Sequence, residues 1–382
     1  MRYKFSGISN LFLLASILSL ALIITVGCTG GGGSPTAPNV VPDGTKILIA
    51  NSLGETLSSF SFQEGTYIAQ NDLAPTGQAP NQIITRGSVC YILNSLSNSI
   101  LALDSTTFNM IYESSVGLGK NPYNMAFINN DEVIITNWLG NDCVRMNVNP
   151  SYASDRILAT IPLPESAELP KDATVKETAA CPQAVVVIGD TAYVTLANLE
   201  TKNFTAGGPG LIALIDLQSN QMLSTIQTTG RNTQGFCIDP FNNQKLYVLS
   251  AGDINPSTWL YDGNGKIDIF DTGTLGITSN FSVVAAPSEM VIAPTGIAYI
   301  TDLMEGRILT FNTSTRFFGG VIDIAKEGTL SYVSGLTLLG SDFLFALEFN
   351  QDELVVIDIQ SGNAILDRIK TGDGPDALVL LP

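Results

Sequence analysis

The sequence repeats itself along most of its 382 residues, and this self-similarity limits the possible folds more than any other feature. Each copy holds a polar opening, often after a proline, then two apolar runs joined by a short turn, and a further strand-like run that ends in Asp or Asn. The clearest copy contains Pro122–Phe127, Val133–Asn137 and Cys143–Asn147. Other complete copies begin near residues 80, 182, 233, 287 and 334. Short apolar runs separated by Gly, Asn, Asp and Pro are typical of β-strands joined by turns.

One copy is divided between the two ends of the chain. Residues 375–381 supply only a first strand, whereas residues 46–51 and 57–62 supply a second and a third. We therefore expect the C-terminal strand to join the N-terminal strands, because closing a ring removes open sheet edges. Residues 46–382 number 337, or roughly 48 for each of seven units, which is the length of a four-stranded blade. The sequence predicts an all-β fold, a seven-bladed β-propeller of four-stranded antiparallel blades.

The copies resemble the YVTN-type β-propeller repeat of exported bacterial proteins and of the lactonase-like propeller group. Tyr193-Val194-Thr195-Leu196 and Ile134-Ile135-Thr136-Asn137 come nearest to the four letters, and no copy spells them in full. The resemblance covers nearly the whole chain after the leader. It implies the fold and leaves the activity open, since this scaffold hosts unrelated functions.

The first residues have the pattern of an export signal. Arg2 and Lys4 precede a mostly apolar run over 11–26, as in a secretory signal peptide. The run ends Thr25-Val26-Gly27-Cys28, which resembles the bacterial lipoprotein box with Thr25 where Leu is usual. That resemblance implies cleavage after residue 27 and acylation of Cys28 by palmitate or a similar lipid. The alternative is a transmembrane anchor of about 16 residues, which is short for a hydrocarbon core of ~30 Å.

The predicted domain order follows from these segments. Residues 1–27 form the signal peptide, and residues 28–45 hold the lipidated Cys28 and a tether rich in Gly, Ser and Pro. Residues 46–382 form the propeller. We expect an exported bacterial lipoprotein that contacts membrane lipid through Cys28, with its body outside the cytoplasm. Thr29 after the cysteine resembles the signal for outer-membrane or cell-surface delivery in enterobacterial lipoproteins.

Composition excludes several kinds of chemistry. The chain has no histidine, so it has no Ser-His-Asp triad, no His-ligated zinc and no imidazole base. Its net charge of −17 argues against nucleic acid as a partner. Four cysteines lie in the repeats, Cys90, Cys143, Cys181 and Cys237, and their spacing forms no metal-binding cluster. An exported compartment permits disulfides, and buried thiols are the alternative, so the pairing stays open.

The openings of the repeats are where a ligand is expected. In a propeller the first strand of each blade lines a central channel, and the loops that enter these strands converge at its mouth. Aligning the copies gives a ring of polar residues one place after each opening: Asn81, Tyr123, Gln183, Gln234, Ser288, Ser334 and Asp376. A second ring of small or polar residues follows: Gln82, Asn124, Ala184, Gly235, Glu289, Gly335 and Ala377. A crowded, wet channel is the alternative explanation. Two acids among amides are a weak indication of Ca²⁺, so no cofactor or metal is predicted.

The second strands end in polar residues whose position is explained by turn chemistry: Asn51, Asn94, Asn137, Asp302 and Glu348. Apolar residues come next, and among them Trp138 and Phe349 are candidates for a platform that binds a partner or ligand. Packing between blades is the alternative for both aromatic residues.

Two insertions interrupt the repeats. Residues 149–181 form either a lid or partner arm, or a solvated loop. Residues 251–266 contain Asp262-Gly263-Asn264-Gly265-Lys266, which together with Asp268 resembles a calcium-binding loop. Lys266 stands where an acid or amide belongs, and Gly273 stands where the bidentate Glu would be, so a turn is the preferred interpretation.

Three functions are consistent with these patterns. The first is a tethered, non-catalytic binding or scaffold module for an unknown protein or small molecule at the channel mouth. The second is a lactonase-like or metal-assisted hydrolase that uses the mouth carboxylates. The third is a structural component of the cell envelope.

Overall fold

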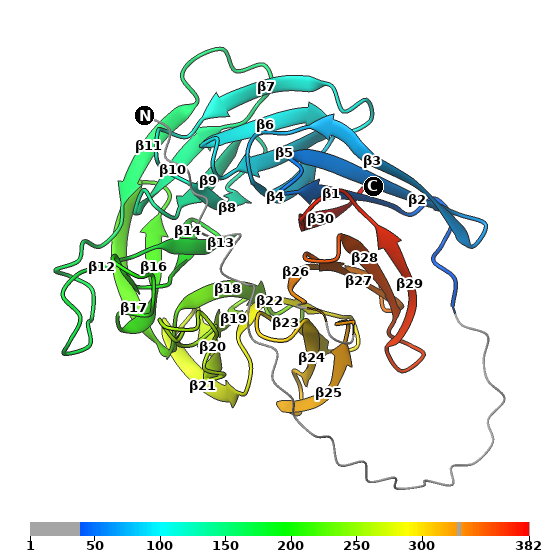
Figure 1. Cartoon of the computed structure of the whole chain (residues 1–382). Helices are drawn as coiled ribbons and strands as arrows, with labels where there is room; N and C mark the ends of the chain where they lie inside the picture. The colour runs from blue at the N-terminus through cyan, green and yellow to red at the C-terminus, as the bar shows by residue number, and fades with distance from the viewer. Residues whose placement is uncertain (1–38, 327–328, 330, 382) are drawn as a thin grey trace, which may run out of the picture. The chain divides into compact units, whose positions relative to one another are not determined.

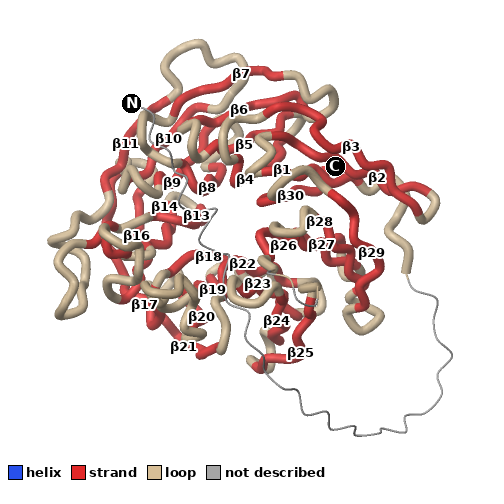
Figure 2. Tube along the Cα trace, viewed as in Figure 1, coloured by secondary structure: helices blue, strands red, loops and turns tan. Residues whose placement is uncertain are grey.

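The computed structural model of the protein describes residues 39–326, 329 and 331–381. Within them the chain consists of strands and loops without helices (Figure 2). Twenty-eight strands form seven antiparallel sheets of four, which stand around a common centre (Figure 1). The seven-bladed, all-β propeller expected from the repeats is therefore confirmed. Cys28 and most of the expected tether lie outside the described residues.

Each sheet is one blade, and its first strand lies nearest the centre of the ring. The blade that contains both chain ends consists of β30 (Pro375–Leu381), β1 (Lys46–Asn51), β2 (Thr56–Gln63) and β3 (Thr66–Pro75). The next two consist of β4 (Pro80–Arg86), β5 (Val89–Asn94), β6 (Ser99–Asp104) and β7 (Met110–Ser115), then β8 (Pro122–Phe127), β9 (Glu132–Asn137), β10 (Asp142–Asn147) and β11 (Ile157–Pro162).

The remaining four blades continue in chain order. The fourth blade consists of β13 (Pro182–Ile188), β14 (Thr191–Leu196), β16 (Pro209–Asp216) and β17 (Gln221–Arg231), and the fifth of β18 (Thr233–Ile238), β19 (Lys245–Ser250), β20 (Gly265–Asp271) and β21 (Gly276–Val283). The sixth consists of β22 (Pro287–Ile292), β23 (Ile297–Asp302), β24 (Arg307–Asn312) and β25 (Phe317–Asp323). The seventh consists of β26 (Val333–Leu339), β27 (Phe343–Glu348), β28 (Glu353–Asp358) and β29 (Ala364–Lys370). A small additional sheet pairs β12 (Thr178–Ala179) with β15 (Leu199–Glu200).

The two ends of the chain meet in one blade, as the divided repeat predicted. Strand β30 pairs antiparallel with β1, so that Leu380 lies opposite Ile47 and Leu378 lies opposite Ile49. The pairing closes the ring and leaves β1 with a hydrogen-bonded partner on each side.

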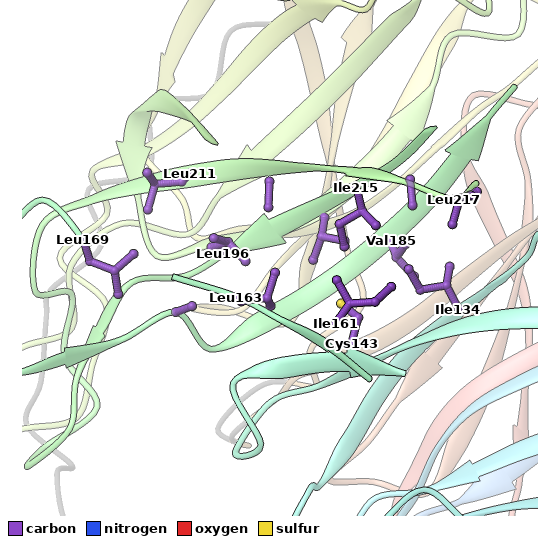
Figure 3. Packing of buried hydrophobic residues seen from close by; sticks show 14 residues of the cluster. Ile134, Cys143, Ile161, Leu163, Leu169, Val185, Leu196, Leu211, Ile215 and Leu217 are labelled. Carbon is purple, nitrogen blue, oxygen red and sulfur yellow. The ribbon is translucent and has the colours of Figure 1, made fainter. Parts of the chain in front are cut away.

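The hydrophobic core lies between neighbouring blades. Central strands such as β5 and β27 are buried along their whole length, because both of their faces are covered by adjacent sheets. One such interface joins Ile134, Cys143 and Ile161 of one blade to Val185 and Ile215 of the next (Figure 3). The outermost strands are exposed on much of their surface, β25 among them.

Threonines near the ends of several second strands connect neighbouring blades. The Asn124 N–H donates to Thr136 Oγ1 at 3.0 Å, and the Thr136 hydroxyl donates to the Gln183 carbonyl of the next blade at 2.6 Å. Thr195 makes the same pair of bonds, and Thr301 makes the first of them. A β-bulge in each inner strand leaves one N–H without a strand partner, and the threonine hydroxyl satisfies it. This explains the threonine at this position in three of the seven blades.

The polar residues that end the second strands bond across the following turns. The Asn94 side chain donates to Ser99 Oγ at 3.3 Å, and Asn137 donates to Asp142 Oδ1 at 2.7 Å. Asp302 accepts from Arg307 Nε at 2.7 Å over the same separation of five residues. These side chains are buried, so they stabilise turns as expected and take no part in a surface site.

The last residues of the expected tether lie against the propeller. Val41 is 7% exposed and packs among residues of β1, β2 and the adjacent blade. The Asn39 backbone N–H donates to Asp358 Oδ2 at 3.2 Å. Residues 39–45, which were expected to belong to the tether, therefore contact the propeller.

The four cysteines of the propeller are free thiols in the described structure. Cys90, Cys143 and Cys181 are buried, and burial raises the pKa of all three thiols, that of Cys90 to about 11. Of the two alternatives for these cysteines, the described structure has free thiols, with Cys237 half-buried. Among the residues described, no helix is long and apolar enough to span a bilayer.

Candidate functional site

A cavity of about 310 Å³ lies where the inner strands of all seven blades meet. Its wall consists of Asn81, Gln82, Ile83, Tyr123, Asn124, Ala184, Gln234, Gly235, Phe236, Ser288, Glu289, Met290, Tyr332, Ser334, Gly335, Leu336, Asp376, Ala377 and Leu378. The volume is at the lower end of the range for small-molecule sites and equals that of about ten water molecules at ~30 Å³ each. The site is therefore large enough for a small organic molecule.

The cavity wall changes from polar to apolar along the inner strands. The first two residues after each strand opening are mostly polar or small, as the sequence alignment indicated. The third residue supplies an apolar layer made of Ile83, Phe236, Met290, Leu336 and Leu378. Successive residues of a regular strand point to opposite faces, but a register shift near the start of each of the seven inner strands changes this alternation. The shifts allow consecutive residues to line one cavity.

Two carboxyl groups, those of Glu289 on β22 and Asp376 on β30, are the acidic groups of this wall. Burial, together with the negative charge of Asp376, raises the pKa of Glu289 to about 8. Burial also raises the pKa of Asp376 to about 7. Both groups face the lumen but are surrounded by the ring of strands, and no Lys or Arg is among the lining residues. The pair titrates near neutral pH because ionising both groups places two like charges in a poorly solvated space.

The hydrogen bonds of the two carboxyl groups differ. Glu289 Oε2 accepts from the Leu336 N–H at 3.3 Å, whereas no donor in the described structure contacts the Asp376 side chain. Asp376 therefore presents both of its oxygens to the cavity.

Tyrosines stand around the same space. Tyr123 follows the opening of β8 and is 38% exposed, and Tyr332 lies just before β26. Burial raises the pKa of both phenols well above the ordinary value, and the charges of Asp376 and Glu289 add to the effect. Tyr261 lies beside the cavity, where its hydroxyl accepts from Gln234 Nε2 at 3.3 Å. All three phenols are neutral, and Tyr123 and Tyr332 lie close enough to the acids to interact with their charges.

The cavity amides are largely committed to holding blades together. Gln82 Oε1 accepts from the Met125 N–H of the next blade at 2.6 Å, and Asn124 Oδ1 accepts from the Val185 N–H at 3.1 Å. Glu289 makes the equivalent bond, so one residue two places after the opening joins adjacent blades in three cases. Asn81 Nδ2 also reaches the next blade and donates to the carbonyl of Tyr123 at 2.9 Å. Sequence reasoning identified these positions but missed this role.

One member of the predicted ring does not belong to the cavity wall. Gln183 is 4% exposed and is absent from the lining, although the equivalent residues of the other six blades are present. Its carbonyl accepts the hydroxyl proton of Thr136, so the residue contributes its backbone to a blade junction. The expectation that its side chain faces the channel is wrong.

The two candidate platform aromatics are partly packed. Trp138 stacks on Phe204 with ring centroids 5.3 Å apart and packs on the buried cluster of Cys181, Ala197 and Leu199. Phe349 meets Tyr332 edge to face at 5.7 Å and therefore supports a residue of the cavity wall. Their environments are those of packing residues, which was the alternative interpretation.

The insertions are tied to the body by ion pairs and hydrogen bonds. Arg231 contacts Asp172 of the first insertion and Asp253 of the second, each at 2.6 Å. In the calcium-like segment, Asn264 bonds twice to Asp253 and Lys266 donates to Ser282 Oγ. These groups form a fixed turn, and no group of three or more acids and cysteines able to hold a metal occurs among the described residues.

Two features of the site were not predicted from the sequence. Tyr332 precedes its inner strand and so lies outside the aligned positions. The apolar layer was visible only as ordinary strand hydrophobicity, and the register shifts that turn it toward the cavity have no signature in one sequence.

Comparison with known proteins adds the fold class. No family model and no curated protein matches the sequence. Among solved structures, a protein from Lactobacillus plantarum superposes with a TM-score of 0.66 at 12% identity, over 88% of this chain and 99% of that chain. A candidate 6-phosphogluconolactonase from Bacteroides fragilis superposes with a TM-score of 0.65 at 13% identity, over 91% of this chain and 100% of that chain. Hydrazine synthase from Kuenenia stuttgartiensis superposes with a TM-score of 0.62 at 14% identity, over 83% of this chain and 92% of that chain. At such low identities these likenesses establish the β-propeller fold alone.

Proposed function

We propose that the protein is a membrane-tethered propeller outside the cytoplasm that binds a small ligand in its central cavity without transforming it. The observation that carries this proposal is the cavity itself, which takes lining residues from all seven inner strands. Such convergence of loops and strand starts at one enclosed space is the usual setting of a ligand site. Tethering through an acylated Cys28 is supported by the leader and the lipoprotein-like box.

The hydroxyl groups of the cavity support binding without covalent catalysis. The Ser334 hydroxyl donates to the Pro375 carbonyl at 2.6 Å, and the Ser288 hydroxyl bonds to Thr301 Oγ1 at 2.8 Å. A serine nucleophile needs a base that accepts its proton, and neither partner is one. The described cavity therefore lacks an activated nucleophile.

A hydrolase remains the second candidate because of the two carboxyl groups. A pKa near neutrality suits general acid–base catalysis, and Glu289 and Asp376 have pKa values of about 8 and about 7. The two functions make opposite predictions for a lactone substrate. If the purified protein hydrolyses lactones and Asp376→Asn abolishes the turnover, the binding-only proposal is wrong.

Ligand binding is tested by filling the cavity. Ala184 lines it, so Ala184→Leu reduces its volume, whereas Ala364→Leu places the same side chain on the exposed outer strand β29. The proposal predicts that small molecules which raise the melting temperature of the wild type do so equally for Ala364→Leu and not for Ala184→Leu. Equal shifts in both variants would locate binding outside the cavity.

Tethering is tested independently of ligand binding. The full chain is expected to incorporate labelled palmitate and to sediment with membranes, and Cys28→Ala is expected to lose both properties. A Cys28→Ala protein that still sediments with membranes would contradict a lipid anchor. If the chain is anchored but no molecule binds the cavity, the third candidate, a structural component of the envelope, replaces the binding function.

A further inference from the structure

The carboxyl groups of the cavity wall face no positively charged side chain of that wall. The amide oxygens of Gln82 and Asn124 are occupied by backbone N–H groups, and the hydroxyl of Ser334 is occupied by a carbonyl. The acceptors left open include both oxygens of Asp376, the second oxygen of Glu289 and Oδ1 of Asn81. The lining includes no Lys or Arg to balance them. Once the two carboxyl groups are ionised, a cationic ligand is the partner that balances their charge.

The size of the cavity and its aromatic wall distinguish between kinds of cation. Calcium takes six to eight oxygen ligands, and most neutral oxygens here are already bonded to the protein. The cavity of about 310 Å³ is also far larger than one ion needs. Tyr123 and Tyr332 place aromatic rings beside the carboxylates, and aromatic faces attract organic ammonium groups by cation–π interaction.

The apolar layer indicates the rest of the ligand. Phe236, Met290 and Leu336 lie one to two residues further along the inner strands than the carboxyl positions. Apolar surface buried there contributes roughly 25 cal/mol per Å². The cavity is thus complementary to a molecule with a cationic head and a short apolar portion.

We propose that the ligand class of this cavity is a small organic ammonium ion, with its head between Glu289 and Asp376 against Tyr123 and Tyr332 and its apolar part on the layer formed by Phe236, Met290 and Leu336. This inference rests on the proposed binding function and specifies its ligand. The net charge of −17 favours the approach of cations to the whole molecule.

The affinity for a permanently charged ammonium ion is expected to depend on pH. The phenols that interact with the acids are those of Tyr123 and Tyr332, and Tyr261 lies beside Gln234. The raised pKa values of all three keep them neutral, and no cationic side chain is in the lining. The carboxyl groups are protonated at pH 6 and largely ionised at pH 9, since their pKa values are about 7 and about 8. Affinity should therefore rise with pH, because the cation binds the ionised form.

The test is calorimetric titration of the full chain, in neutral detergent, with choline, with the neutral alcohol in which carbon replaces the choline nitrogen, and with Ca²⁺. At pH 9 choline should bind at least tenfold more tightly than the alcohol, and its affinity should fall at least tenfold at pH 6. Benzyltrimethylammonium, which carries an apolar ring, should bind more tightly than choline.

Matched variants test whether Glu289 and Asp376 are responsible for the binding of choline and for its pH dependence. Glu289→Gln keeps an oxygen acceptor for the Leu336 N–H and removes the charge, and Asp376→Asn removes the second charge. Each substitution should weaken the binding of choline at least fivefold and remove most of its pH dependence. Glu113→Gln on the exposed outer strand β7 should leave the choline affinity and its pH dependence unchanged.

The possible contrary results are distinct. Equal binding of choline and the alcohol, tighter binding of Ca²⁺ than of either, or an unaltered affinity in Glu289→Gln would overturn the ammonium inference. If the alcohol binds as tightly as choline and Ala184→Leu abolishes its binding, the cavity is a ligand site but its ligand class is not an ammonium ion. Absence of any binding would count against both.

Discussion

At the scale of single residues, the cavity holds its two carboxyl groups in surroundings that favour their neutral forms. The folded pKa values of Glu289 and Asp376 lie above the ordinary values near 4. Between about pH 4 and pH 8 the folded state therefore binds more protons than the unfolded state. Stability contributed by these groups is present at low pH and is lost as pH rises through this window.

Stability should respond to pH through these two residues. The melting temperature of the wild type is expected to fall from pH 5 to pH 8, and the double variant Glu289→Gln, Asp376→Asn should show a fall smaller by roughly 2–4 °C. At pH 8 the double variant should be the more stable protein. Scanning calorimetry from pH 5 to pH 8 measures the melting temperatures of the wild type and the double variant, with Glu113→Gln as the control. Parallel curves for the wild type and the double variant would show that the carboxyl groups are well solvated in the folded state.

The cysteines give a second prediction at this scale. Burial raises the pKa of Cys90, Cys181 and Cys237 to between about 11 and about 12, so their thiols are neutral and react slowly. A thiol reagent should label the native protein weakly and should count four thiols after unfolding, both with and without prior reduction, when Cys28 is acylated. Two additional thiols after reduction would reveal a disulfide.

The residue scale also shows what one sequence can convey about the site. Asn81, Tyr123, Gln234 and Asp376 were found because their position in the repeat fixes their place at the mouth. Gln183 occupies the same position and yet is buried, since repeat position determines the backbone and leaves the side chain free to turn away.

At the scale of elements, the joints between blades depend on hydroxyl and amide groups near the strand ends. Thr136 accepts from the backbone of its own inner strand and donates to the carbonyl of Gln183 in the next blade. Strand positions were predictable because apolar runs and turn residues alternate in every copy. The inter-blade bonds were not, because they join residues 12 and 47 positions away from Thr136 that no local pattern relates.

Loss of one such joint should be measurable. Thr136→Val keeps the shape of the side chain but leaves the Gln183 carbonyl and the Asn124 N–H without their partner. We expect a loss of about 1–3 kcal/mol in the free energy of unfolding, measured with urea. Thr136→Ser retains the hydroxyl and should lose less than half as much. Equal losses for the two variants would mean that the methyl group, and not the hydrogen bonds, stabilises the joint.

At the scale of the whole molecule, the pairing of β1 with β30 makes the seven blades one cooperative body. Removing residues 375–382 deletes the inner strand of the first blade, exposes the edge of β1 and takes Asp376 from the cavity. The truncated chain should unfold at a melting temperature at least 10 °C lower and should aggregate, as expected for open sheet edges. Circular dichroism with heating, compared with removal of Pro382 alone, measures the effect. Unchanged cooperative melting after the longer deletion would contradict ring closure.

The most direct test of the central claim is a crystal structure of the protein grown with benzyltrimethylammonium at pH 9. We expect β30 to be hydrogen-bonded to β1, and the cation to lie inside the ring with its nitrogen near Glu289 and Asp376 and its phenyl group toward Phe236 and Leu336. A cation bound only on the outer surface, or a C-terminal segment that lies away from Ile47–Asn51, would contradict it.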